Sequence, residues 1–103
     1  MRVYIGVDLG TSALKITAVD DQRRVVGRTT AGYTTESPRP GWAEQHPGEW
    51  VRVLQDALSG LLAALPAQAQ PQALALSGQL PTLVVAAPDG TVMVEGIAPD
   101  PTK

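Results

Sequence analysis

The first 33 residues constrain the fold most, because apolar and polar side chains alternate there in three runs separated by short polar turns. The runs are residues 2–8, 13–20 and 23–33, and the turns are residues 10–12 and 20–22. Alternation with a period of two is typical of a strand with one buried face. Short turns between successive strands favour antiparallel pairing. The sequence therefore begins with a predicted antiparallel meander of three strands.

A single helix is predicted over residues 47–65, after an irregular connection at 34–46 that is rich in proline and glycine. Pro47 suits the first helical turn, where its missing N–H costs nothing, and Pro66 ends the helix. Apolar residues recur at three- and four-residue steps and form one face. That face consists of Trp50, Leu54, Ala57, Leu58, Leu61 and Leu65.

The rest of the chain is predicted to return to strands. Residues 67–71 are a linker, 73–77 a short apolar strand, 83–87 and 91–95 a hairpin, and 96–103 a frayed end. A strand–helix–strand crossover favours parallel pairing, most simply beside the first strand. The expected fold is α/β, with a five-stranded sheet covered by the helix on one face. The second face is expected to be bare, which would make the isolated chain marginal or self-associating.

Composition excludes several classes of protein. A chain of 103 residues suits one small domain, and a formal net charge of −2 gives no support for nucleic-acid or anionic-membrane binding. The absence of cysteine excludes disulfides and thiolate metal sites. Neither a secretory signal nor the ~18 apolar residues of a membrane span is visible. These features favour a cytoplasmic protein.

The most informative polar residue is Asp8, which ends an apolar strand and precedes the turn Gly10-Thr11-Ser12. A carboxylate beside a loop rich in N–H and hydroxyl donors can hold a phosphate chain with its magnesium ion. The alternative is an ordinary turn, since aspartate and glycine are common turn residues. Lys15 could reach a phosphate from the second strand, or it could be an exposed strand lysine.

Three segments together resemble a known family. Residues 7–15, VDLGTSALK, resemble the first phosphate-binding hairpin of the actin-like ATPase superfamily. Residues 40–50, PGWAEQHPGEW, resemble the "GWxEQDPxxW" element of the FGGY carbohydrate kinases, and residues 75–79, ALSGQ, resemble their "GxSGQ" strand end. The order and approximate spacing also match. The resemblance is greatest to the xylulokinases, and it implies the ribonuclease-H-like half of the actin-like ATPase fold.

The resemblance implies ATP-dependent phosphorylation of a small-molecule sugar, a ketose such as xylulose or a polyol, with Mg²⁺. Asp8 would hold the metal, usually through water. Gly10 would let the backbone approach the phosphates, and Thr11 and Ser12 would donate hydrogen bonds to them. Lys15 completes the expected cofactor-binding set.

On the substrate side, the resemblance places Gln79, Leu80 and Pro81 at the sugar. Leu80 and Pro81 stand where xylulokinase-like sequences typically carry Met-His, so they depart from the pattern. Trp42 and Glu44 are expected to have structural roles, with the Trp42 ring buried. His46 replaces the usual aspartate before the helix and is a weaker cap.

The resemblance also implies that residues 1–103 form the beginning of an N-terminal lobe, truncated relative to the two-lobed kinases. The general base and the adenine pocket would lie beyond the chain, so the isolated chain is expected to be inactive. A full-length protein could form a homodimer. Two alternatives stay open: a non-catalytic remnant or binding module of the same fold, and another actin-like ATPase.

Overall fold

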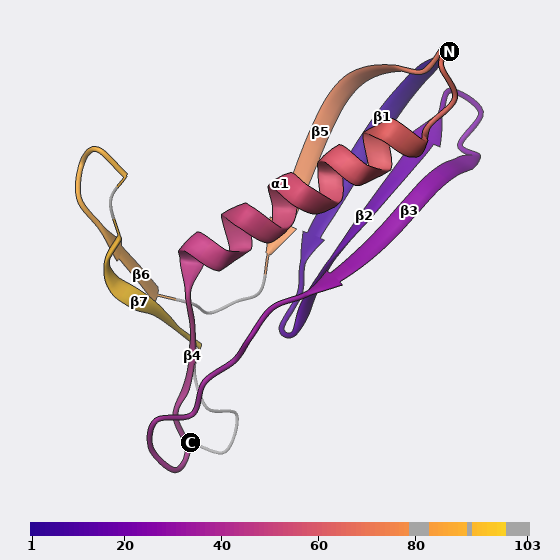
Figure 1. The fold of residues 1–103 in the computed structure, drawn as a ribbon. Coiled ribbons are helices and arrows are strands. Elements are labelled where there is room, and N and C mark those ends of the chain that lie inside the picture. The colour runs from indigo at the N-terminus through magenta and orange to yellow at the C-terminus, as the bar shows by residue number, and fades with distance from the viewer. Residues whose placement is uncertain (79–82, 91, 99–103) are drawn as a thin grey trace.

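The computed structural model describes residues 1–78, 83–90 and 92–98. Its main sheet has four strands in the order β3-β2-β1-β5, drawn in Figure 1. β1 (Arg2–Leu9), β2 (Ala13–Asp20) and β3 (Val25–Gly32) form the predicted antiparallel meander, and β5 (Gln70–Gly78) runs parallel to β1. The meander and the parallel crossover strand are therefore confirmed.

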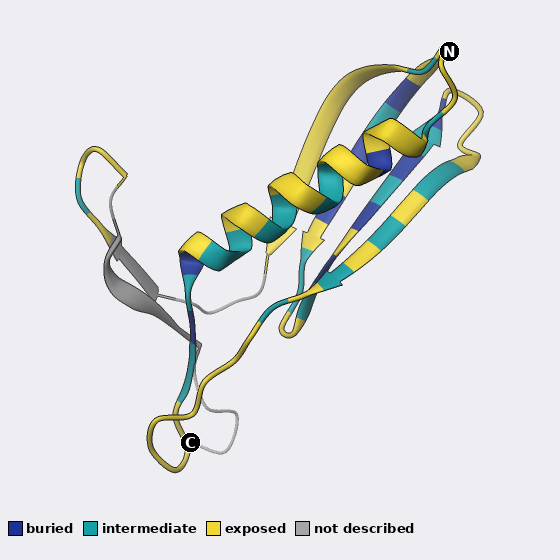
Figure 2. Ribbon diagram, in the orientation of Figure 1, coloured by how far each residue is buried: buried dark blue, intermediate teal, exposed yellow. Residues whose placement is uncertain are grey.

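The core lies between the sheet and the single described helix, α1 (Pro47–Ala64). Alternate residues of the first two strands point toward α1, as the sequence pattern predicts, and Figure 2 shows this alternation along the ribbon. The buried apolar residues are Val3, Ile5, Val7, Leu14, Ile16, Ala18 and Leu61. The amphipathic face of α1 thus buries the apolar face of the sheet, with Leu61 as its most enclosed residue.

The helix packs closely against β3 at Gly27. A Cβ atom at this position would lie 2.8 Å from Leu61 Cδ1 and 3.0 Å from Leu65 Cδ2. In Figure 1 the helix runs antiparallel to β1 and crosses in front of the sheet. Within the described part of the chain, no helix is long and apolar enough to cross a membrane.

Among the described residues one helix covers one face of the sheet, so the second face is bare as expected, but the exposed leucines do not lie on it. Leu74 and Leu76 pair with Ile5 and Val7, so they share the face that α1 covers. They are nevertheless 48% and 64% exposed, because α1 packs mainly over β3 and β2. The uncovered apolar surface therefore lies on β5, beside the helix.

A second sheet replaces the expected fifth strand. It has the order β4-β7-β6 and consists of β4 (Ala43–Gln45), β7 (Val92–Ala98) and β6 (Leu83–Ala86). The prediction of one five-stranded sheet is wrong, and so are two local predictions. Residues 43–45 are a strand within the supposedly irregular connection, and residues 96–98 continue β7 because they pair with β4.

Two strand boundaries also differ from the predictions. β5 begins at Gln70 instead of residue 73, so the last two residues of the expected linker are strand, with a register shift between Val3 and Tyr4 of β1. β3 begins at Val25 because Arg23, with φ of 63°, still belongs to the turn. The helix starts at Pro47 as predicted, and His46 precedes it without a side-chain capping hydrogen bond.

Candidate functional site

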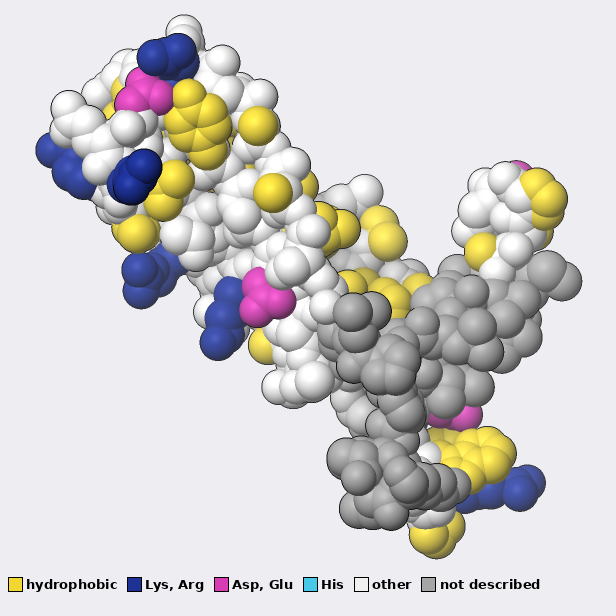
Figure 3. All heavy atoms as spheres, turned by 180° about the vertical axis from the view of Figure 1, so that it is seen from behind, with side chains coloured by type: hydrophobic (Ala, Val, Ile, Leu, Met, Phe, Trp, Pro, Cys, Tyr) yellow, Lys and Arg dark blue, Asp and Glu magenta, His cyan; other side chains and the backbone are white. Residues whose placement is uncertain are grey.

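Asp8 lies at the carboxyl end of β1 on the sheet face opposite α1, and its side chain is exposed. Its strand neighbours are Lys15 of β2 and Ser77 of β5, and Ser77 Oγ donates a hydrogen bond of 3.3 Å to Asp8 Oδ1. The structure therefore places Asp8 beside Lys15 and Ser77, while the proposed contacts of Asp8 and Lys15 with a phosphate stay predictions. Figure 3 views this face, where charged side chains stand among scattered hydrophobic ones.

An open hollow of about 460 Å³ surrounds Asp8 on this face. It is lined by Gly6, Val7, Asp8, Lys15, Thr17, Ala75, Leu76 and Ser77. A Cβ atom added at Gly6 would meet nothing within 4 Å, so the glycine keeps the floor of the hollow low. The hollow thus combines one carboxylate, one ammonium and hydroxyl groups, which suits a polar or charged ligand.

The metal chemistry of the hollow follows from this donor set. Among the residues that the structure describes, no group of three or more His, Asp or Glu side chains could enclose a metal ion. Mg²⁺ is usually held by one or two carboxylates together with phosphate oxygens and water. Asp8 therefore fits a magnesium ion that arrives with a phosphate chain, and it does not fit a metal held by protein ligands alone.

Gly10 is needed by the turn after β1 for a local reason. Its N–H donates a 3.0 Å hydrogen bond to the carbonyl oxygen of Ala13, and a Cβ atom at Gly10 would lie 2.8 Å from that same oxygen. Because this neighbour is backbone, it could move only if the whole turn moved. Close packing within the turn therefore accounts for the glycine. The expected close approach of a phosphate stays a prediction.

The three backbone carbonyls of the turn all accept hydrogen bonds from other parts of the protein. Tyr33, just after β3, donates its hydroxyl to the Gly10 oxygen and its backbone N–H to the Ser12 oxygen at 3.2 Å. Gln45, the last residue of β4, donates its Nε2 to the Thr11 oxygen at 2.6 Å. The turn is thus fixed from two sides by residues that are far from it in the sequence.

Gln45 is a buried polar residue, only 3% exposed, at the junction of β4 and α1. Its Nε2 also donates to Thr35 Oγ1 at 2.6 Å, and its Oε1 accepts a 3.0 Å hydrogen bond from Trp50 Nε1. A buried amide is costly unless its donors and acceptor are satisfied, so these contacts fix its orientation. The sequence motif that contains Gln45 predicts no role for its side chain, and Tyr33 is predicted only as the end of a strand.

Burial raises the pKa of the Tyr33 hydroxyl, and the negative charge of Asp8 raises it further. The hydroxyl consequently stays protonated at neutral pH and remains a donor to the Gly10 carbonyl.

The remaining predicted site residues have different outcomes. Thr11 and Ser12 are exposed in the turn, next to the hollow in sequence but not part of its lining. The expected burial of Trp42 is wrong: its side chain is 43% exposed, with the Arg39 guanidinium 5.1 Å from the ring centroid. Glu44 lies in β4, where it pairs with Glu36 and Ile97.

The predicted substrate residues Gln79, Leu80 and Pro81 lie outside the described residues, so their proposed contact with a sugar stays a prediction.

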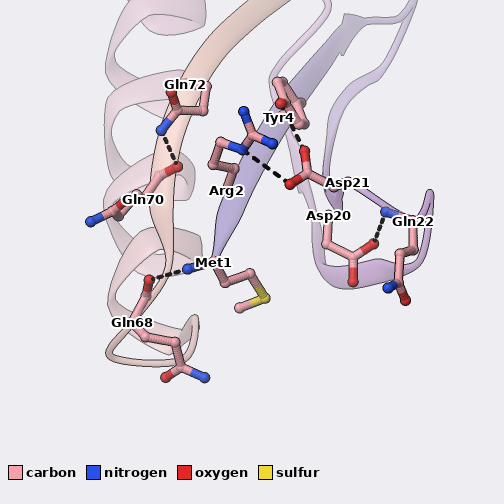
Figure 4. Close-up of polar contacts among 9 residues, drawn as sticks. All are labelled: Met1, Arg2, Tyr4, Asp20, Asp21, Gln22, Gln68, Gln70 and Gln72. Carbon is pink, nitrogen blue, oxygen red and sulfur yellow. Dashed lines mark hydrogen bonds and ion pairs between the residues drawn. The ribbon is translucent and has the colours of Figure 1, made fainter.

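A separate polar cluster closes the opposite end of the sheet, shown in Figure 4. Asp21 accepts hydrogen bonds from Arg2 Nε at 3.1 Å and from the Tyr4 hydroxyl at 2.9 Å, and the N-terminal ammonium donates to the Gln68 carbonyl at 3.0 Å. The hydrogen bond to Asp21 raises the pKa of Tyr4. These contacts join the start of the chain to the turns at Asp21 and Gln68, far from Asp8. They therefore stabilise the fold and take no part in the hollow around Asp8.

Comparison with known proteins gives consistent matches. The model of the FGGY family of carbohydrate kinases, N-terminal domain, matches residues 3–98. Xylulose kinase from Bacillus subtilis is 33% identical over 104 residues, which cover 100% of this chain and 21% of that protein. Xylulose kinase from Lactococcus lactis is 35% identical over 86 residues, covering 82% of this chain and 17% of the other.

A solved structure agrees with these sequence matches. The crystal structure of xylulose kinase from Rhodospirillum rubrum superposes with a TM-score of 0.87 and 30% identity, over 93% of this chain and 20% of that one. The chain therefore spans about a fifth of the length of the relatives that it matches.

Proposed function

The chain belongs to the FGGY family of carbohydrate kinases, and we propose that a protein carrying it phosphorylates a sugar with ATP and Mg²⁺. The proposed acceptor is a hydroxyl of a ketose such as xylulose, or of a polyol. Support for the ketose comes from the relatives named xylulose kinase. The reaction would take place in the cytoplasm, where ATP is available.

The observation that carries the proposal is the position of Asp8. Its exposed carboxylate stands at the carboxyl ends of two parallel strands, over an open hollow and just before a turn whose Thr11 and Ser12 amides donate no hydrogen bond within the described part of the chain. Ligands of α/β sheets collect at such strand ends. Phosphoryl transfer depends mainly on positioning and on neutralising charge, so one carboxylate near a donor-rich turn is a suitable contribution.

The proposed roles follow from this placement. Asp8 would hold Mg²⁺, usually through water, and Thr11 and Ser12 would donate hydrogen bonds to phosphate oxygens. Lys15 would add a positive charge on the neighbouring strand. When bound, Mg²⁺ would neutralise charge on the phosphate chain. Gln79, Leu80 and Pro81 would border the sugar.

The matched segment would contribute one wall of the active site, as the first part of an N-terminal lobe. The general base and the adenine pocket are proposed to come from elsewhere in a protein of the relatives' length. The chain's own contribution is then to hold the metal and the phosphates.

A chimaera tests the proposal. The matching segment of Bacillus subtilis xylulose kinase would be replaced by residues 1–98 of this chain, and xylulose-dependent ADP release would be measured. We expect activity above that of a matched chimaera carrying Asp8→Asn. A chimaera that folds with the parent's melting temperature, binds xylulose and yet releases no ADP would refute the proposed function.

A further inference from the structure

We infer that Tyr33 and Gln45 are positioning residues that aim the backbone N–H groups of Thr11 and Ser12 at the phosphate chain. The inference deepens the proposed function and rests on it. Neither residue would touch the ligand. Each would act through one peptide unit of the turn, and the two peptide units are adjacent.

The first step of the argument is the geometry of the peptide bond. In a planar trans peptide, the carbonyl oxygen of one residue and the N–H of the next point in opposite directions. The Gly10 carbonyl is bound by the Tyr33 hydroxyl, so the Thr11 N–H must point away from Tyr33. The Thr11 carbonyl is bound by Gln45 Nε2, so the Ser12 N–H must point away from Gln45.

The second step concerns what those two N–H groups bind. Among the residues that the structure describes, neither the Thr11 nor the Ser12 amide donates a hydrogen bond, and both residues are exposed. Successive N–H groups that project from one turn form a concave site for anions. Two adjacent, unpaired and similarly fixed donors are therefore available to a phosphate oxygen.

The third step is that both positioning groups are themselves held. Gln45 is buried, and its amide is bonded at one end to Trp50 and at the other to Thr35 as well as Thr11. Tyr33 packs against the hydrophobic core and donates a second hydrogen bond, from its backbone N–H, to the Ser12 carbonyl. The turn is thereby attached both to the core and to the start of α1, and it would need little reordering on binding.

A role limited to stability would affect the two donors equally, whereas the proposed geometry assigns one donor to each residue. Losing the Tyr33 hydroxyl frees the peptide that carries the Thr11 N–H. Losing the Gln45 amide frees the peptide that carries the Ser12 N–H. This one-to-one correspondence is the property to measure.

The experiment uses the 103-residue chain, labelled with ¹⁵N and kept at a concentration at which sedimentation velocity shows it to be monomeric, with magnesium tripolyphosphate as the probe. Amide chemical shifts and backbone order parameters are recorded with and without the probe. The variants are Tyr33→Phe and Gln45→Met, which remove the donors and keep similar volumes. Tyr4→Phe and Gln72→Met are the matched controls. Tyr4→Phe removes a hydroxyl that bonds Asp21 at the opposite end of the sheet, and Gln72→Met removes an amide from an exposed position of β5.

For the wild-type chain we expect the Thr11 and Ser12 amides to shift most on addition of the probe. Tyr33→Phe should lower the order parameter of Thr11 first, and Gln45→Met that of Ser12 first. Each should weaken binding of the probe about threefold to tenfold, the range expected for one hydrogen bond. The controls should bind as the wild-type chain does.

The outcomes separate the inference from the proposed function. If the variants loosen their assigned amides but no chain binds tripolyphosphate, the positioning stands and the phosphate role of the turn fails. If the wild-type chain binds and both variants bind equally well with unchanged order parameters, the positioning inference is overturned. Equal loosening of both amides in both variants would also overturn it.

Discussion

Ser77 of β5 and Asp8 of β1 are joined by a 3.3 Å hydrogen bond although they are 69 positions apart in the sequence. The bond links the carboxyl ends of the two parallel strands, where Asp8 pairs with Ser77 in register. A serine hydroxyl that donates to one carboxylate oxygen leaves the other available. The pair therefore steadies Asp8 without removing its capacity to bind a cation.

Asp8→Asn in the chimaera should lower kcat at least about 100-fold, because the charge opposite the metal and phosphates is lost in the transition state. Thermal stability should change little, since the side chain is exposed. Steady-state kinetics and melting curves would measure both. Asp56→Asn, on the exposed side of α1, is the charge-matched control. Near-normal turnover of Asp8→Asn would mean that Asp8 has no role in the reaction.

The isolated chain should show no measurable sugar phosphorylation. The chain carries the proposed metal and phosphate contacts but spans about a fifth of its relatives' length. The general base that the reaction needs is proposed to come from elsewhere in a protein of that length. A coupled ADP-release assay with xylulose and several polyols would test this. Sustained release that depends on both ATP and sugar would contradict it, and heat-denatured chain sets the background.

Gly10→Ala and Gly6→Ala should change stability in opposite directions. The new methyl group at residue 10 would meet the Ala13 carbonyl oxygen at 2.8 Å, which should cost roughly 1–3 kcal/mol. At residue 6 the methyl group meets nothing within 4 Å, and alanine should gain about 0.5–1 kcal/mol over glycine in a strand. Denaturant unfolding of both variants would measure this. Equal effects would show that the turn adjusts freely.

Asp20 should make the fold sensitive to acid. Its carboxylate accepts hydrogen bonds from the backbone N–H groups of Arg24 and Gln22, which hold its pKa below the ordinary value although burial opposes this. Because the folded pKa is the lower one, this stabilisation is complete above the unfolded pKa of about 4. It is lost as the pH falls through the folded value.

The measurement for Asp20 is the melting temperature between pH 6 and pH 2. The wild-type chain should lose stability over this interval more steeply than Asp20→Asn, which has no carboxylate to protonate. Asp56→Asn should keep the wild-type slope. Identical slopes for the wild-type chain and Asp20→Asn would mean that Asp20 does not contribute.

The exposed leucines of β5 should cause the isolated chain to self-associate. Leu74 and Leu76 remain largely in water, and each forfeits part of the roughly 1.5–3 kcal/mol of full burial. The double variant Leu74→Gln, Leu76→Gln should shift the chain toward monomer in sedimentation velocity. Val51→Gln changes a similarly exposed residue of α1 and should not. A wild-type chain that stays monomeric at high concentration would contradict this prediction.

The parts of the fold that depend on local pattern could be predicted from the sequence. Alternation in residues 2–20 places the buried side chains of β1 and β2 correctly, and the crossover predicts that β5 runs parallel to β1. β4 could not be found in this way. It has three residues, and its pairing depends on β7, whose sequence lies about fifty residues further along the chain.

The candidate site was predictable to the same extent. Asp8 and the turn after it are local features, so sequence alone could propose them. The bonds from Tyr33 and Gln45 could not be proposed, because their acceptors are backbone carbonyls, which every residue has. Only the folded arrangement determines which carbonyl a given side chain reaches.

The pairing of β4 with β7 also has a consequence for biosynthesis. Residues 43–45 leave the ribosome well before residues 96–98, to which they pair. At roughly 5–20 residues per second, β4 waits several seconds for its partner strand. During that interval β1 to β3 can already have formed, because their contacts are close in sequence. The nascent chain would thus form the β1–β2 hairpin that carries Asp8 early. The hydrogen bond from Gln45 to the turn of that hairpin would form last, after β4 has paired with β7.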